Sequence, residues 1–146
     1  MVDCIICAKH RGEGPLGGEL VAAADGFRVY HASPAEDGRA SLGHLFIETE
    51  RHVAYVTELT DDEAGALGRL RTRLARALMD ETSVERTFAM VIGTSVAHFH
   101  EHVMARHTGT PKEVPWYRSH EAAPRADVTT VRDLARRLSL RLPPRS

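Results

Sequence analysis

The chain has 146 residues, of which 42% are hydrophobic, and a formal net charge of -1 at pH 7. This composition suits one globular domain with a modest core, and a nearly neutral chain has no strong field to draw it onto nucleic acid or an anionic membrane. No apolar run approaches the about 20 residues that span a bilayer, and the first residues lack the apolar core of a signal peptide. We therefore expect a single domain, residues 1–146, in the cytoplasm, with no nucleic-acid or membrane partner.

The first motif in the chain is a C-x-x-C formed by its only two cysteines, Cys4 and Cys7. Structural disulfides are rare in a reducing compartment. A thioredoxin-like redox pair follows a strand and opens a helix, whereas this motif leads into charged and glycine-rich sequence. We favour half of a zinc site over a redox pair or inert thiols. Tetrahedral zinc needs two further ligands, and the nine histidines are their obvious source.

The next segments predict strands. The apolar runs 19–24 and 27–31 flank Asp25-Gly26, which is a strong β-hairpin signal because both turn positions favour positive φ. A polar loop separates them from a further strand predicted over residues 43–47.

A long amphipathic helix is expected over about residues 61–80. Thr60 and Glu63 form a capping box at its start. Four leucines then recur at helical spacing and predict the face that packs on the core: Leu67, Leu70, Leu74 and Leu78.

The rest of the chain predicts two more strands, a tail and a helix. We expect a buried strand over residues 87–92, a second strand over 96–105, and a C-terminal region, 108–146, that wraps over the body. A last helix starts near Asp127 or Thr129, with Val131, Leu134 and Leu138 on its apolar face. This order predicts an α+β fold with an antiparallel sheet of about five strands and two helices on one face.

The stretch from Val96 to His107 contains four histidines, and three of them alternate: His98, His100 and His102. On a strand they would share one face, about 6.5–7 Å apart. A dry core rarely supplies partners for three imidazoles. Two chemistries are consistent with such a row. The histidines could share a catalytic metal, or one could attack phosphorus while its neighbours stabilise the phosphate.

The residues before the histidine row favour phosphate chemistry. Gly93 allows close approach of the backbone, and Thr94 and Ser95 offer hydroxyl and amide groups to phosphate oxygens. Alone, these three residues do not indicate a phosphate site. Their position next to the histidine row makes phosphate binding the favoured interpretation.

The sequence HFHEHVM resembles the H-x-H-x-H-x-x signature of the histidine triad (HIT) superfamily of nucleotide hydrolases and transferases. DCIICAKHRGE is similar to the zinc-binding start of that family, and GHLFIETERHVAYVTELTDDEAGALG is similar to its G-H strand, R-H pair and L-T-D-E-E helix. The resemblance covers most of residues 4–106. It implies a HIT-like fold, a homodimer, and cleavage of a phosphoramidate, anhydride or ester bond at the α-phosphate of a nucleotide through a nucleotidyl-histidine intermediate.

The same resemblance implies roles for individual residues. His100, the middle histidine, would be the nucleophile. His102 and the segment of Gly93, Thr94 and Ser95 would stabilise phosphate oxygens, and His44 would lie beside the nucleotide. His31 lies near the position at which relatives carry a ribose-binding aspartate, which leaves recognition of ribose open.

For the metal, the resemblance implies a structural, four-coordinate zinc ion. The ligands would be Cys4, Cys7, His52 and His98, and the metal would hold His98 so that His100 is aimed correctly. His10, three residues after Cys7, is a competing ligand.

Several features depart from the pattern or carry no motif. Glu101 stands where the signature has an apolar residue, so we expect either a buried carboxylate paired with one of three arginines or a relaxed sheet edge; the candidate partners are Arg86, Arg106 and Arg118. We expect Trp116 to anchor the tail, or else to stack on a leaving group or partner subunit, and His107 and His120 to lie on the surface. Two other functions stay open: a zinc-supported nucleotide- or phosphate-binding module with little turnover, and a metallohydrolase in which the triad holds the metal.

Overall fold

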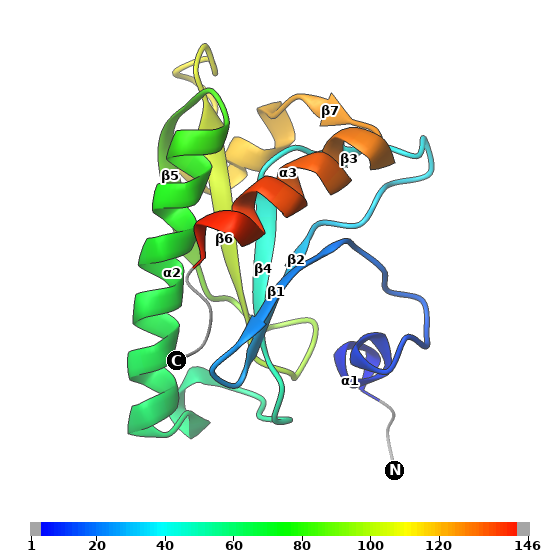
Figure 1. Cartoon of the computed structure of the whole chain (residues 1–146), viewed down its shortest axis with the longest axis vertical. Coiled ribbons are helices and arrows are strands. Elements are labelled where there is room, and N and C mark those ends of the chain that lie inside the picture. The colour runs from blue at the N-terminus through cyan, green and yellow to red at the C-terminus, as the bar shows by residue number, and fades with distance from the viewer. Residues whose placement is uncertain (1–3, 143–146) are drawn as a thin grey trace.

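The computed structural model describes residues 4–142, which form an antiparallel sheet with two long helices on one face (Figure 1). The sheet has five strands in the order β1-β2-β4-β6-β5. The strands are β1 (Leu20–Ala24), β2 (Phe27–His31), β4 (His44–Thr49), β5 (Val84–Met90) and β6 (His100–His107). The α+β fold with about five antiparallel strands is therefore confirmed.

The remaining elements are helices and short pairings. The helices are α1 (Ile5–His10), α2 (Asp61–Glu81) and α3 (Val128–Arg141), with 3₁₀ turns η1 (Val56–Glu58) and η2 (Trp116–Ala122). A second, two-stranded sheet pairs β3 (Ala40–Ser41) with β7 (Arg125–Ala126). Within residues 4–142, no helix is long and apolar enough to cross a membrane.

The local signals for the hairpin and helices are confirmed. Asp25 and Gly26 have φ values of 53° and 84° at the turn between β1 and β2, as a two-residue turn between twisted strands requires. The Thr60 side chain accepts from the amide of Glu63 at the start of α2, and Asp127 caps α3 in the same way through the amide of Thr130. The predicted apolar faces of both helices are buried.

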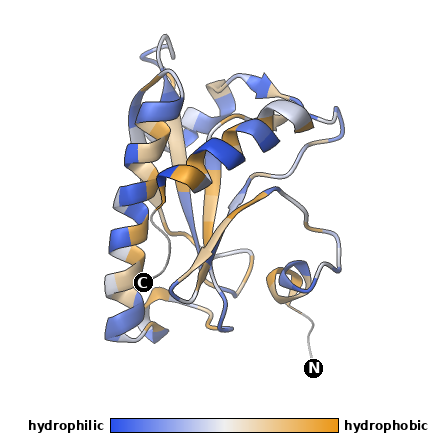
Figure 2. Ribbon diagram, viewed as in Figure 1, coloured by the Kyte–Doolittle hydropathy of each residue, from blue (hydrophilic) through white to orange (hydrophobic). Residues whose placement is uncertain are grey.

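The core lies between the sheet and the two long helices. Phe27, Leu45, Ile47, Leu74 and Leu138 are among its fully buried side chains. Figure 2 shows hydrophobic residues along the central strands and hydrophilic residues on the outer sides of α2 and α3. The helices cover one face of the sheet, and its other face remains open for the N-terminal segment and for a site.

Two strand predictions need correction. The strand predicted as buried over 87–92 is β5, which begins at Val84, ends at Met90 and forms an edge of the sheet. Its side chains are mostly exposed or half-buried. The next strand begins at His100 rather than at Val96. The segment before it forms a loop, although the amide of Phe99 still donates to the carbonyl of Val53.

Candidate functional site

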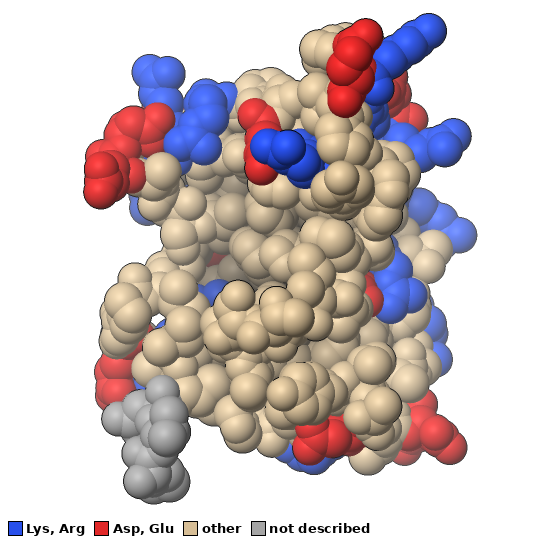
Figure 3. All heavy atoms as spheres, turned by 180° about the vertical axis from the view of Figure 1, so that it is seen from behind, with Lys and Arg blue, Asp and Glu red and all other residues tan. Residues whose placement is uncertain are grey.

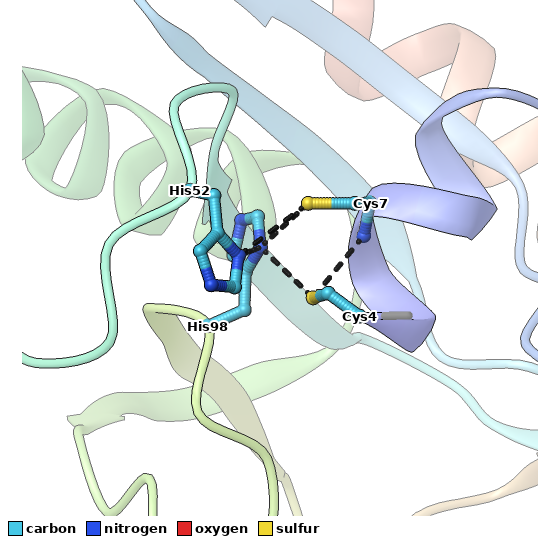
Figure 4. Close-up of side chains that lie close together, drawn as sticks. All are labelled: Cys4, Cys7, His52 and His98. Atoms are coloured by element: carbon cyan, nitrogen blue, oxygen red, sulfur yellow. Dashed lines mark hydrogen bonds between the residues drawn. The ribbon is translucent and has the colours of Figure 1, made fainter. Parts of the chain in front are cut away.

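The N-terminal motif meets two distant histidines at one point (Figure 4). Cys4 lies just before α1 and Cys7 lies within it, His52 follows β4, and His98 precedes β6. One ligand atom from each residue lies within 4.8 Å of every other. The structure therefore brings together the four predicted metal ligands, from three segments of the chain.

The spacing of these atoms fits tetrahedral zinc. With Zn–N bonds of about 2.0 Å and Zn–S bonds of about 2.3 Å, the ligand atoms of a tetrahedron lie about 3.3–3.8 Å apart. His98 Nδ1 lies 3.3 Å from Cys4 Sγ, 3.5 Å from Cys7 Sγ and 3.2 Å from His52 Nδ1. Cys7 Sγ lies 3.5 Å from His52 Nδ1. These contacts correspond to edges of a coordination tetrahedron, and the soft thiolates favour zinc over a hard cation.

A further hydrogen bond orients the ring of His98. Its Nε2 donates to the carbonyl of Thr49 at 2.7 Å, so its Nδ1 lone pair is left for the metal, as metal-bound histidines usually require. Burial, more than any other influence, lowers the pKa of His98 and keeps the ring neutral. His98 is completely buried. Its two nitrogens are engaged away from the other triad rings, so the three histidines do not converge on one metal ion.

The competing ligand, His10, does not join the cluster. Its Nε2 lies 2.9 Å from a carboxylate oxygen of Glu48, and its ring packs edge-on against His98 with centroids 5.6 Å apart. Among the described residues, the metal-ligating set is therefore completed by His52.

The ring of His100 is fixed by the backbone of the metal ligand. His100 Nδ1 donates to the carbonyl of His98 at 2.8 Å. In this tautomer the Nε2 atom carries the free lone pair. His100 also lines a pocket of about 340 Å³, a volume in the range of small-molecule sites. An unprotonated ring nitrogen is thus held beside a cavity of a size that suits a small molecule.

His102 and His44 form a neutral imidazole pair beside His100. His44 Nε2 lies 3.0 Å from His102 Nδ1, and the rings of His100 and His102 have centroids 5.6 Å apart. Burial, followed by the charges of His120 and His102, lowers the pKa of His44 to about 3. Burial, followed by the charge of His100, lowers the pKa of His102 to about 4. Both rings are therefore neutral at pH 7, and a neutral ring can donate one hydrogen bond without a permanent charge.

The pocket beside His100 is mainly apolar. It lies between α1, the loop after it, the end of β2 and the strands β4 and β6. Its apolar side chains are Ile5, Ile6, Leu16, Phe46 and Val96, and its charged ones are Lys9 and Glu48. Figure 3 shows the face opposite to that of Figure 1, where uncharged side chains surround a hollow and most charged side chains lie at the rim.

Besides the histidine row and His44, the residues predicted to contact the ligand are His31 and the segment 93–95. His31 is completely buried, its Nδ1 donates to the carbonyl of Ala32, and its Nε2 accepts from the amide of Gly43. Both ring nitrogens are thus occupied by the backbone, although His31 lines the same pocket as His100. A contact of this side chain with a nucleotide stays a prediction. Gly93, Thr94 and Ser95 lie in the loop before β6, and their role at a phosphate stays a prediction.

Glu101 is buried and paired, but with an arginine that the sequence did not point to. Its side chain is 2% exposed and forms two hydrogen bonds of 2.7 Å with Arg71 of α2. The hydrogen bonds to Glu101 raise the pKa of Arg71 further. None of the three arginines expected to pair with it does so. Arg106 instead donates to the carbonyls of Pro111 and Val114 and so holds the tail.

Sequence reasoning also missed residues near the site. The ring of His120 lies 4.7 Å from that of His44, between centroids, and its Nδ1 is buried without a hydrogen bond. His107 is 6% exposed and donates to the carbonyl of Leu42. Both were expected on the surface, since no spacing links them to the triad. Trp116 packs on Phe88 with centroids 5.4 Å apart, which fits its expected role as an anchor of the tail.

Known proteins resemble this chain in structure, but comparisons of sequence found no match. The sequence matches no protein-family model, and a search of curated proteins found no relative. A zinc-bound histidine triad family protein from Mycobacterium smegmatis has 18% identity and a TM-score of 0.66, with 95% of this chain and 92% of that one covered. A histidine triad protein from Sinorhizobium meliloti has 21% identity and a TM-score of 0.69, with 86% and 90% covered.

A third neighbour is described as a hypothetical histidine triad nucleotide-binding protein from Sulfolobus tokodaii. It has 16% identity and a TM-score of 0.69, and the match covers 94% of this chain and 91% of that one. These likenesses show that the chain has the histidine triad fold, as the resemblance of HFHEHVM implied.

Proposed function

We propose that the protein is a nucleotide hydrolase or transferase that cleaves a bond at the α-phosphate through a nucleotidyl-His100 intermediate. The observation that carries this proposal is the hydrogen bond from His100 Nδ1 to the carbonyl of His98. It fixes the tautomer and leaves the Nε2 lone pair at a pocket of about 340 Å³. Covalent catalysis of this kind divides one difficult displacement into two easier ones.

In the first step, His100 Nε2 attacks the α-phosphorus while the bond from phosphorus to the leaving oxygen or nitrogen breaks. The leaving group takes up a proton. In the second step, water, or another acceptor in a transferase, attacks the same phosphorus. The phosphorus–Nε2 bond then breaks, and the electron pair returns to His100. The attacking group releases one proton to solvent, which balances the proton that the leaving group took up in the first step.

The neighbouring imidazoles support the charge that develops on phosphate. When His44 Nε2 donates to His102 Nδ1, the proton of His102 is on Nε2 and can be donated to a phosphate oxygen. The low pKa of His102, about 4, favours the neutral ring in this role. A single donor of this kind contributes about 10²–10³ in rate.

The zinc ion has a structural role in this proposal. Its four protein ligands leave no open position, and the likeness to the zinc-bound protein from Mycobacterium smegmatis supports its presence. Bound zinc would fix the backbone of His98, whose carbonyl orients His100. A reducing compartment such as the cytoplasm would keep Cys4 and Cys7 as ligands.

We also propose a homodimer. The edge strand β5 exposes its backbone polar groups on one side, and exposed apolar residues follow it, with Val91 43% and Ile92 52% exposed. An open sheet edge is commonly protected by pairing or cover.

The proposed function is tested by assaying product formation on nucleotide phosphoramidates, dinucleoside polyphosphates and nucleoside diphosphate sugars. His100→Asn should abolish turnover on the best substrate while zinc content and nucleotide binding persist. His102→Asn should lower the rate by about 10²–10³-fold. His107→Asn, on the same strand but away from the pocket, is the control for loss of a strand histidine.

Retention of a tenth of wild-type turnover by His100→Asn would show that His100 is not the nucleophile. Absence of turnover on the whole panel, together with tight nucleotide binding, would instead favour the binding module.

A further inference from the structure

A buried cluster of charged residues closes one part of the pocket next to His100. Glu48 on β4 has a side chain that is 3% exposed, and the side chain of Lys9 on α1 is 8% exposed. The Lys9 ammonium donates to one carboxylate oxygen of Glu48, and His10 Nε2 lies 2.9 Å from the other. Lys9 also sits over the ring of Tyr30, 4.2 Å from its centroid.

The cluster has unused hydrogen-bonding capacity. An ammonium group has three N–H donors, and within residues 4–142 the structure gives Lys9 one hydrogen bond, to Glu48. Each carboxylate oxygen of Glu48 has two lone pairs and one protein partner. Burial of charges is costly unless their hydrogen-bonding groups are satisfied. Because both residues line the pocket, a ligand can supply the missing partners.

The cluster is also placed next to the reacting group. Glu48 and His100 are directly paired across β4 and β6, so their side chains lie on the same face of the sheet, and adjacent strands are about 4.8 Å apart. A group bound at Lys9 and Glu48 is therefore close to a phosphate that is bound at His100. In a nucleoside 5′-phosphate, the sugar occupies this position.

We propose that Lys9 and Glu48 form a subsite that binds the hydroxyl groups of the substrate's sugar. This inference rests on the proposed function and names the part of the substrate that its pocket selects. A hydroxyl both donates and accepts, so it can accept from the Lys9 ammonium and donate to the Glu48 carboxylate.

Other ligand groups match the pair less well. A second phosphate or a carboxylate is repelled by Glu48, and an ammonium group is repelled by Lys9. The apolar walls formed by Ile5, Ile6, Leu16 and Val96 fit a flat ring but offer no partner for a hydroxyl. Of the other polar side chains that line the pocket, His31 has both ring nitrogens engaged by the backbone and Ser33 offers a single neutral hydroxyl. The Lys9–Glu48 pair is therefore the group that offers the sugar both a charged donor and a charged acceptor.

The test compares adenosine 5′-phosphoramidate with its 2′,3′-dideoxy analogue as substrates. Wild-type protein should show a KM at least about tenfold lower for the ribose substrate, because a hydrogen bond to a charged group has that effect on affinity. Lys9→Met and Glu48→Gln should raise the KM for the ribose substrate toward that of the analogue, with a much smaller change in kcat. Lys9→Arg, which keeps donors, should retain part of the preference.

The control is Lys112→Met, since Lys112 is the only other lysine and is exposed. It should keep the full preference for ribose. Zinc content and melting temperature are measured for every variant. If Glu48→Gln unfolds, the comparison of Lys9→Met with Lys112→Met still decides the matter.

Binding measurements with a ribose compound and its dideoxy analogue test the sugar subsite separately from catalysis. Calorimetry measures adenosine 5′-monophosphate and its 2′,3′-dideoxy analogue on the wild type and on Lys9→Met. A Lys9-dependent preference for ribose without any turnover would support the subsite and contradict the enzyme. Equal affinities for the two compounds, or no binding of either, would overturn the proposed subsite even if turnover is found.

Discussion

Removing Arg71 should destabilise the protein far more than removing a neighbouring arginine of the same helix. Arg71→Met leaves the carboxylate of Glu101, which is 2% exposed, without its two hydrogen bonds of 2.7 Å. Loss of one partner from a buried ion pair costs about 3–5 kcal/mol. The Arg71 side chain is itself 38% exposed, so water can partly replace it, and we expect a loss of about 3 kcal/mol.

The assay is urea denaturation followed by circular dichroism at neutral pH, with Arg73→Met as the matched control. Arg73 is exposed on α2, and a surface substitution of this kind changes stability by about 0.5 kcal/mol or less. The double variant Arg71→Met/Glu101→Leu should recover most of the loss, because an apolar pair of similar volume can replace a buried ion pair at little cost.

Equal stabilities of the Arg71→Met and Arg73→Met variants would refute the reasoning. A double variant that is no more stable than Arg71→Met alone would show that the cost does not come from the unpaired carboxylate.

Three further predictions concern the metal, the histidine pair and assembly. Purified protein should contain about one zinc ion per chain; His52→Gln should lose it and His10→Gln should keep it, as measured by metal analysis, and the reverse result would exchange their roles. The pKa values of His44 and His102 are lowered to about 3 and about 4, below the unfolded value of about 6.5. The unfolded chain therefore binds more protons between these values, so the stability contributed by the two neutral rings is complete above about pH 6.5 and is lost as the pH falls toward 4. A His44→Gln/His102→Gln variant should accordingly lose less stability than the wild type between about pH 7.5 and 5.5 in denaturant titrations, and identical losses would contradict the assignment. Sedimentation should give about twice the chain mass of 16.1 kDa, and a fully active monomer would count against the proposed dimer.

Features with a local chemical signature were predictable from the sequence. Asp25-Gly26 marks a turn by its backbone preferences, Thr60 and Glu63 mark a helix start, and both were confirmed. Cys4 and Cys7 were predictable as half of a zinc site from their C-x-x-C spacing. His52 and His98 as the other two ligands followed from the resemblance to the histidine triad superfamily, and the structure brings all four within 4.8 Å of one another.

Features that depend on tertiary pairing were not predictable in the same way. Glu101 finds Arg71, thirty residues away on α2, and sequence spacing does not specify which of many arginines faces it. His98 was expected to share a strand face with His100, but it precedes the strand and its Nδ1 contacts Cys4 and Cys7 at the metal site. Lys9 and Glu48 have no motif, and only the packing of α1 against the sheet brings them together.

The central claim is that His100 forms a covalent bond to phosphorus, and the most direct measurement is detection of that adduct. Wild-type protein is mixed with a nucleotide phosphoramidate and quenched within milliseconds without acid, and its peptides are mapped by mass spectrometry. The account predicts a nucleotidyl group on the peptide that contains His100, localised to that residue and absent from His100→Asn. A nucleotidyl group on another residue, or rapid turnover with no adduct in wild-type protein under conditions that preserve phosphoramidates, would contradict it.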